Sequence, residues 1–149
     1  MNAASSWVVS DQPFFLSGRT YNQVDQTHTY GQDYDGQEPS ELLAAPQSAW
    51  LPQHVEKAYY RTNIGITNTG SQLAAVTLAL YDGSGNRVWL DTREYAPGGF
   101  YQYQQPYLPF GGTANGYAKV TVSVGSGVVA YASVTDQATG DPTTIAMKR

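Results

Sequence analysis

Residues 60–95, YRTNIGITNTGSQLAAVTLALYDGSGNRVWLDTREY, decide the fold class of this 149-residue chain. Ile64 and Ile66 alternate with small or polar residues, and the same alternation returns at 76–80. A period of two places apolar side chains on one face of a strand, so each run predicts a half-buried strand. Turn-forming residues at 68–70 and 82–86 separate the runs. The stretch therefore predicts three strands, at 58–67, 73–81 and 87–95.

The strand pattern continues to the end of the chain. Further strands are predicted at 100–105, 117–124, 128–135 and 143–146. A turn is expected at 96–99, where Pro97 fixes φ and glycine follows. Short strands at regular spacing with Gly-rich turns are typical of two antiparallel sheets packed face to face. We therefore expect an all-β, immunoglobulin-like antiparallel β-sandwich of seven to nine strands in a single domain.

The sequence before residue 58 is less regular. Residues 1–30 contain strand-forming residues without clear alternation, and residues 31–57 contain three prolines. Because proline interrupts helices and ladders, we predict an irregular connection there, with one helical turn at 40–45. The expected organisation is a main sandwich at 58–149. The segment 1–57 is expected to supply an N-terminal strand and a connection that pack on the same or a neighbouring sandwich.

The composition argues against several function classes. The net charge is −4 and the eight Lys and Arg are scattered, which argues against nucleic acid as a partner, because phosphate binding needs clustered basic residues. No apolar run approaches the ~18 residues of a membrane-spanning helix, and no signal peptide is expected at the N-terminus. The chain has no cysteine, which excludes disulfides and thiolate metal sites. A charged fraction of only 13%, with abundant hydroxyl, amide and phenol groups, favours an extracellular or cell-surface location.

Three segments together are similar to secreted bacterial β-sandwich repeats. They are RTNIGITNTG at 61–70, LYDGSGN at 80–86 and VVAYASVTDQATGDPT at 128–143. GRTYNQ at 18–23, with TYGQ at 29–32, resembles a motif found at the end of such repeats. The resemblance covers most of the chain from residue 16. It implies an extracellular accessory module with a β-sandwich fold, and it implies no catalytic residues.

The N-terminal segment is a candidate interface. Residues 16–23 loosely resemble 131–137, in the last long strand that the pattern predicts. Such a segment can complete its own sandwich or pair with a neighbouring subunit, because an unpaired edge is a template for strand addition. The predicted interface residues are Trp7, Val8, Val9, Phe14, Phe15, Leu16 and Tyr21. The leading hypothesis is a structural or interaction module that forms homo-oligomers or filaments, or that docks to adjacent modules.

A carbohydrate-binding module is the alternative. Aromatic and amide side chains crowd residues 95–110, and on a strand Tyr101 and Tyr103 share one face. Sugar rings stack on aromatic planes, so an exposed face of this kind would suit a polysaccharide. Core packing and a protein interface are competing interpretations of the same residues, and we rank both above glycan binding. The candidate glycan-binding residues are Tyr95, Tyr101, Tyr103 and Tyr107.

Catalysis and metal binding rank last. The acidic segment 33–38 has part of a calcium-loop pattern but lacks its closing Glu, so we interpret it as a solvated loop. The segment 82–86 has the residues of an ordinary hairpin turn. His28 and His54 are the only histidines, and no GxSxG nucleophile elbow accompanies them. The sequence therefore predicts no enzyme, no metal site and no cofactor.

Overall fold

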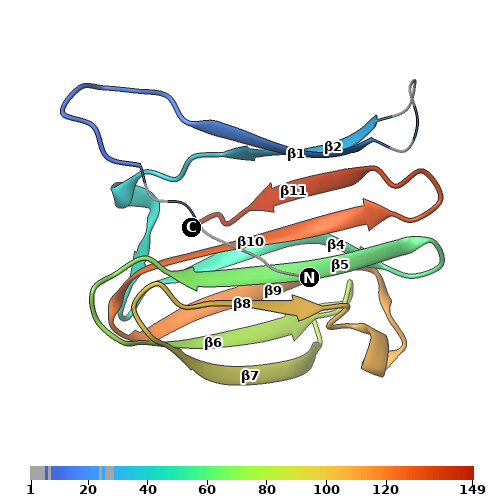
Figure 1. Ribbon diagram of the computed structural model, residues 1–149. Coiled ribbons are helices and arrows are strands. Elements are labelled where there is room, and N and C mark those ends of the chain that lie inside the picture. Colours follow the sequence, from blue (N-terminus) through green and yellow to red (C-terminus); the bar gives the residue numbers. More distant parts are fainter. Residues whose placement is uncertain (1–5, 7, 24, 26–28) are drawn as a thin grey trace.

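The computed structural model describes residues 6, 8–23, 25 and 29–149, without the side chains of Asn22 and Thr29. These residues form eleven strands and two short 3-10 helices, and no α-helix lies among them. The strands pair antiparallel, and nine of them build two sheets that pack face to face (Figure 1). The predicted all-β sandwich is confirmed.

The first sheet has the order β11-β10-β5-β8, and a short strand β3 pairs with β10. Its strands are β3 (Leu43–Ala44), β5 (Tyr60–Asn68), β8 (Phe100–Gln104), β10 (Ser126–Asp136) and β11 (Pro142–Ala146). The second sheet has the order β4-β9-β6-β7. Its strands are β4 (Ser48–Glu56), β6 (Ala74–Tyr81), β7 (Arg87–Tyr95) and β9 (Thr113–Val124). A separate hairpin pairs β1 (Ser17–Gln23) with β2 (Thr29–Asp35).

Six of the strands lie in the order of an immunoglobulin-like sandwich. The run β4-β9-β6 corresponds to strands B, E and D of that fold, and β5-β10-β11 corresponds to C, F and G. β7 adds an edge to the first group, and β8 adds an edge to the second. The chain crosses between the sheets at β3–β4, β4–β5, β5–β6, β7–β8, β8–β9 and β9–β10.

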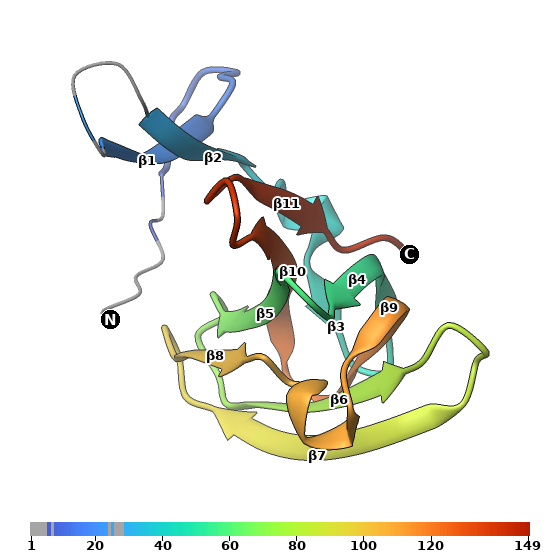
Figure 2. The same ribbon diagram turned by 90° about the vertical axis from the view of Figure 1, so that its right-hand side faces the viewer.

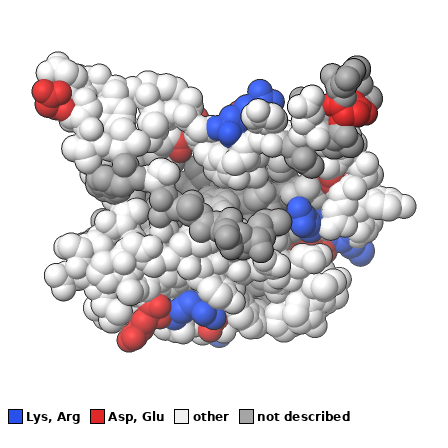
Figure 3. Space-filling model, viewed as in Figure 1, with Lys and Arg blue, Asp and Glu red and all other residues white. Residues whose placement is uncertain are grey.

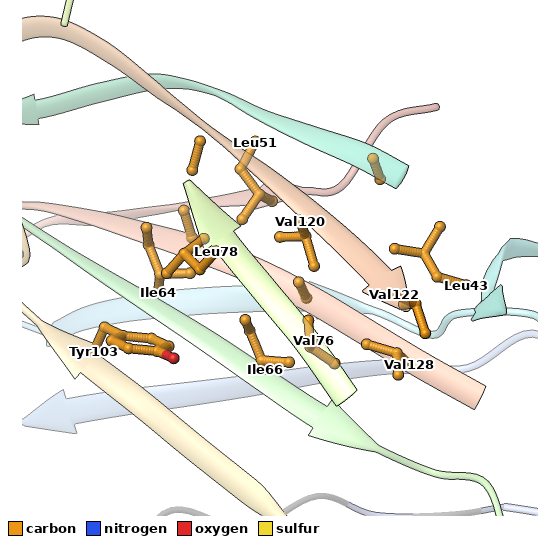
Figure 4. Close-up of a cluster of buried hydrophobic side chains, with 14 of the residues drawn as sticks. Leu43, Leu51, Ile64, Ile66, Val76, Leu78, Tyr103, Val120, Val122 and Val128 are labelled. Carbon is orange, nitrogen blue, oxygen red and sulfur yellow. The ribbon is translucent and has the colours of Figure 1, made fainter. Parts of the chain in front are cut away.

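Alternating side chains of the two sheets meet in the core (Figure 4). Ile64 and Ile66 of β5 lie against Leu78 of β6 and Val120 of β9, and all four are buried. The polar residues between them face outward or pair across the sheet, as a period of two requires. Removing this apolar surface from water is the main stabilising term of the sandwich, because each fully buried aliphatic side chain contributes roughly 1.5–3 kcal/mol.

The side chain of Asn68 forms hydrogen bonds with the turn after β5 and with the end of β7. Its side-chain amide donates to the carbonyls of Gln72 over 2.7 Å and Tyr95 over 3.0 Å. Its Oδ1 accepts the amide of Gly70 over 2.9 Å. The predicted turn at 68–70 is therefore present, and a buried amide side chain replaces the backbone partners that the turn lacks.

The structure corrects the prediction for residues 31–57. They are not an irregular connection: they contain part of β2, the 3-10 helix η1 (Pro39–Glu41), β3 and all of β4. The predicted helical turn at 40–45 is wrong, because the helix begins earlier, with Glu38 as its N-cap, and the chain is a strand again at Leu43. The main sandwich therefore begins near Leu43, and its expected boundary at residue 58 is also wrong.

The sequence pattern did not predict β4, because polar residues interrupt the apolar alternation of its inner face. Its inner face carries Ala49 and Leu51 but then His54 and Glu56, so the apolar alternation stops halfway along the strand. The register with β9 also shifts between Leu51 and His54, where Pro52 and Gln53 interrupt the ladder. A bulge of this kind breaks the period of two on which the sequence argument depends.

Candidate functional site

The hairpin β1–β2 stands apart from the two sheets (Figures 1 and 2). β2 lies over the outer face of β10 and β11, while β1 lies further out. The side chains described in β1 are all exposed. Two strands without a shared core are marginal in water, so this hairpin depends on the contacts that β2 makes.

Gln32 is the polar centre of that contact. It is buried, and its Oε1 accepts a hydrogen bond from Ser133 Oγ of β10 over 3.3 Å. Tyr34 OH donates to the same oxygen over 2.9 Å. Beside it, Thr144 Oγ1 of β11 donates to the carbonyl of Asp33 over 2.7 Å. The hairpin is thus attached by side chains that replace water partners, each worth about 1 kcal/mol net.

An aromatic contact completes the attachment. The rings of Tyr34 and Tyr131 meet edge to face with centroids 6.1 Å apart. The Tyr131 ring lies across Gly65 of β5, where a Cβ atom would collide with it, and its hydroxyl donates to Gln102 Oε1 over 3.3 Å. Burial raises the pKa of Tyr131. Gly65 therefore leaves the space in which Tyr131 lies flat and receives the hairpin.

The outer edge of β1 is open. The amide of Gly36 donates to the carbonyl of Leu16 over 2.9 Å, so these two residues form a hydrogen-bonded pair. Hydrogen-bonded and non-hydrogen-bonded pairs alternate along an antiparallel ladder. In the register of β1 with β2, the backbone groups of residues 17, 19, 21 and 23 consequently point away from β2. No other strand of the described chain pairs with that edge.

Apolar side chains lead directly into this edge. We call residues 8–16 the N-terminal arm. Val9 is 79% exposed and Phe15 is 86% exposed, and Tyr21 of β1 is also largely exposed. The other predicted interface residues in the described chain are exposed as well: Val8, Phe14 and Leu16. Trp7 lies outside the described residues. The predicted interface residues are thus at the surface, and their partner stays a prediction.

The four tyrosines expected to bind a glycan do not form an exposed platform. Tyr95, Tyr103 and Tyr107 are buried. Tyr101 and Tyr103 do share a face of β8, but they pair in register with Ile66 and Ile64, so this face points inward. Tyr101 is 38% exposed, so the four tyrosines do not together form the expected sugar-binding face, and glycan binding by this segment stays a prediction. Sequence alternation shows which residues share a face, and it cannot show which face is covered.

Two charged side chains of β7, Arg93 and Asp91, contact the tyrosines of β8. Arg93 lies 3.7 Å above the centroid of the Tyr101 ring, and it pairs with Asp91 over 3.7 Å. Tyr103 OH donates to Asp91 Oδ2 over 2.9 Å, and burial raises the pKa of Tyr103. A cation over an aromatic face stabilises the edge of the sandwich by up to about 1 kcal/mol at such a site. Tyr101 and Tyr103 therefore pack against Arg93 and Asp91 at the edge of the sandwich.

His54 is a buried structural histidine. Tyr107 OH donates to the carbonyl of Tyr117 over 2.8 Å, so His54 Nδ1 donates to Tyr107 over 2.9 Å. Burial lowers the pKa of His54 to about 4, which keeps the ring neutral. Glu56 on the same strand is also buried, and its desolvation raises its pKa to about 7. His28 lies outside the described residues, so its relation to His54 stays untested.

The acidic segment 33–38 is only partly a loop, because residues 33–35 belong to β2. Asp33 is 3.5 Å from Arg19 across the hairpin, and both side chains are largely exposed. Asp82 accepts the amides of Ser84 and Asn86 over 2.9 Å each, which confirms the predicted turn at 82–86. Hydrogen bonds from Asn86 lower the pKa of Asp82. Among the described residues, no group of three or more His, Asp or Glu could hold a metal ion.

The described surface offers little enclosed volume for a small ligand. An open hollow of about 240 Å³ is lined by Ser40, Glu41, Met147 and Arg149. This volume is below the roughly 300–1,000 Å³ of small-molecule pockets. No helix of the described chain is long and apolar enough to cross a membrane.

Comparison with known proteins adds no relative. No family model, no curated protein and no solved structure matches the chain. The resemblance to secreted bacterial repeats accordingly stays a prediction.

Sequence reasoning missed the residues that attach the hairpin. Tyr131 lies about a hundred positions from Gln32 and Tyr34, and each is ordinary in its own strand. One signal was present: a glycine inside a strand, such as Gly65, marks a place where another group approaches the backbone closely. The register that places Tyr131 opposite Gly65 exists only in the folded sheet.

Proposed function

We propose that this protein is an interaction module that joins a second copy of itself, or a neighbouring module, by strand addition through the N-terminal arm and β1. The observation that carries the proposal is the continuity of two features. The exposed apolar residues of the arm run directly into the open backbone edge of β1. Backbone groups supply affinity and apolar side chains supply burial when a strand is added to a sheet.

The other strand edges differ in how well they resist pairing. β7 carries four charged residues, and charge protects an edge. β4 contains Pro52, and part of its edge is bridged by Lys148, whose amide donates to the carbonyl of Trp50 over 2.8 Å. β11 begins with Pro142. β8 has neither charge nor proline in Phe100–Gln104. The edge of β8 is therefore the acceptor that we propose for the β1 of another copy.

Such a contact joins two different surfaces, so it does not close on itself as a two-fold dimer does. Repetition of the contact would give a ring or a filament. A symmetric pairing of β1 with β1 would instead stop at a dimer. The mass of the particle in solution distinguishes these arrangements.

An extracellular or cell-surface location belongs to the same proposal. The support is compositional: only 13% of the residues are charged. The face shown in Figure 3 is mostly uncharged, with acidic and basic groups in small separate clusters. A surface of hydroxyl, amide and phenol groups can dock to another module without desolvating many charges.

The test is light scattering across protein concentration, followed by electron microscopy of any large species. Tyr21→Pro removes an outward-facing amide of β1, and Gln104→Pro does the same for β8; neither amide belongs to its strand's existing ladder. We expect the parent protein to assemble and each variant to stay monomeric. Equimolar mixing of the two variants should give dimers, because each keeps one intact surface.

Hydrophobic contributions are tested separately. Phe14→Ser with Phe15→Ser should weaken assembly by at least about tenfold, because two exposed rings lose their burial. The matched control is Leu73→Ser with Leu108→Ser, which removes exposed apolar side chains elsewhere and should leave assembly unchanged. A parent protein that is monomeric at every concentration would contradict pairing with a second copy and would leave a neighbouring module as the partner. Assembly that survives Tyr21→Pro would contradict the role of β1.

A further inference from the structure

The outer face of the sheet β4-β9-β6-β7 lies on the far side of the sandwich from the hairpin (Figure 2). Cross-strand register arranges its side chains in rows. One row runs Ser48, Thr121, Thr77 and Thr92, with one residue from each of the four strands. The adjacent row runs Trp50, Lys119, Ala79 and Leu90. A row of hydroxyls thus lies directly beside a row that begins with an exposed indole.

Trp50 heads an aromatic cluster on this face. It is 40% exposed, and its ring centroid lies 5.7 Å from that of Tyr117 and 5.9 Å from that of Tyr81. The two tyrosine rings stack on each other at 5.0 Å with an interplanar angle of 4°. Three mutually packed rings hold the indole in a fixed orientation while part of its surface stays in contact with water. A rigid, partly exposed aromatic is the side chain that loses least entropy on binding.

The hydroxyl row keeps hydrogen-bonding capacity. Ser48 Oγ and Thr121 Oγ1 are 2.9 Å apart, and Thr77 Oγ1 and Thr92 Oγ1 are 2.8 Å apart. Each pair uses one of its two hydroxyl hydrogens internally. One donor and several lone pairs per pair remain for an external group. These groups are fixed on strands, so they present a regular polar surface to a polyhydroxylated ligand.

Lys119 gives this face a positive charge. Its Nζ is 5.3 Å from the centroid of the Trp50 ring. The ion pairs found among the described residues join Arg19 to Asp33 and Arg93 to Asp91, and neither involves Lys119. In a chain with a net charge of −4, an uncompensated ammonium beside an exposed indole favours an anionic ligand with an apolar ring face.

We propose that this face binds an acidic polysaccharide whose repeating units are hexuronate pyranoses. The C–H face of one sugar ring packs on Trp50, its carboxylate pairs with Lys119, and hydroxyls of the adjoining unit exchange hydrogen bonds with the Ser/Thr row. This site does not involve the arm, β1 or β8. A negative result for polysaccharide binding would therefore leave the strand-addition proposal unaffected, and the reverse also holds.

The first experiment is electrophoresis of the native protein through gels that contain polygalacturonate or alginate, with xylan gels and polymer-free gels alongside. We expect retardation by the uronate polymers that weakens with added salt, because part of the affinity is ionic. Tyr21→Pro should bind as the parent does, which separates binding from assembly. No retardation of the parent by either uronate polymer would overturn the proposal. Equal retardation by xylan, unaffected by salt, would overturn the uronate assignment.

Variants then assign the contacts. Trp50→Ala should weaken binding by at least about tenfold, as for an aromatic residue at the centre of a contact. Lys119→Met keeps the aliphatic stem over the ring and should lose the salt dependence together with about tenfold of the affinity. Thr121→Val should weaken polysaccharide binding about threefold, because one hydroxyl partner is lost. Tyr101→Ala, on the other sheet, is the control and should bind as the parent does.

Folding of the variants is checked by thermal unfolding. If Trp50→Ala is unfolded, Lys119→Met still decides the uronate assignment, because its fold does not depend on an ion pair. Tryptophan fluorescence gives a second readout: the uronate polymer should change the emission of the parent, and a Trp50→Phe variant should lose that change. Unchanged binding by a folded Trp50→Ala or Lys119→Met variant would overturn the site.

Discussion

The sandwich and the hairpin β1–β2 are stabilised in different ways. The sandwich has a continuous core of aliphatic side chains from both sheets, in which Ile64, Leu78 and Val120 are buried. The hairpin has no core of its own and is attached through Gln32 and Tyr34, with every described side chain of β1 exposed. Burial of apolar area makes the sandwich one cooperative unit, whereas a few polar and aromatic contacts allow the hairpin to detach separately.

The comparison also explains where binding is possible. A strand inside the sandwich has both edges paired and cannot add another chain. β1 is held on one side only, so the backbone groups of its other side stay available. The low stability expected of the hairpin is thus the same property that lets it exchange partners.

The largest expected effect is the loss of a core side chain. Leu78→Ala should lower the free energy of unfolding by about 2–5 kcal/mol, because it removes buried methyl groups and leaves a cavity. Chemical denaturation followed by circular dichroism measures this change. An effect below about 1 kcal/mol would show that the two sheets do not share one tightly packed core.

Glu56 tests the interior through pH. Its folded-state pKa of about 7, against an ordinary value of 4.5, means that the folded protein binds more protons than the unfolded chain between these pH values. Stability therefore falls as the pH rises from 4.5 through 7, and the loss is complete above that range. Burial lowers the pKa of His54 to about 4, so its contribution has the opposite sign between pH 4 and 6.5.

A difference measurement isolates the carboxyl group. Glu56→Gln keeps the shape and removes the charge, so its stability relative to the parent should rise by about 2–3 kcal/mol from pH 4.5 to pH 8. His54 is present in both proteins and cancels in the difference. Denaturation at a series of pH values provides the data, and a pH-independent difference would mean that Glu56 does not titrate in this range.

The contact between hairpin and sandwich has a smaller expected effect. Tyr34→Ala and Tyr131→Ala should each speed amide exchange at residues 29–35, because the edge-to-face contact is lost. Their coupling energy in a double-mutant cycle should be about 0.5–1.5 kcal/mol. Amides of β6 serve as the internal control and should exchange as slowly as before after Tyr34→Ala. Additive effects of the two changes would show that the rings do not act together.

The smallest expected effect is in the arm. Phe15→Ala should change the free energy of unfolding of the dilute monomer by less than about 0.5 kcal/mol, because the side chain is exposed. The contrast with Leu78→Ala is the sharpest form of the comparison, since both substitutions remove a large apolar side chain. Strong destabilisation by Phe15→Ala would mean that the arm packs on the sandwich in solution.

Much of the fold could be predicted from local patterns. The strand predicted at 87–95 coincides with β7, and those at 73–81 and 143–146 differ from β6 and β11 by one residue at the start. β4 could not be predicted, because polar residues replace half of its inner face. The prediction for β9 began four residues too late, at 117, because Gly116 and its neighbours resemble a turn.

The candidate sites were harder to predict than the strands. The arm was recognised because several large apolar residues stand close together before the first strand. The tyrosines of 95–110 were placed on the correct shared face, but the covering of that face by β7 was not visible. The row of Ser48, Thr121, Thr77 and Thr92 joins four strands, and no local pattern connects residues so far apart in the chain.

The sequence by itself determined the fold class, most of the strands and the turns, because alternation and turn chemistry act over a few neighbouring residues. It also determined that charge is sparse and that the arm is apolar. The tertiary structure alone decided which faces are buried, which edge stays open and which side chains meet across strands. Those outcomes depend on register and sheet order, which are set by the packing of residues distant in sequence.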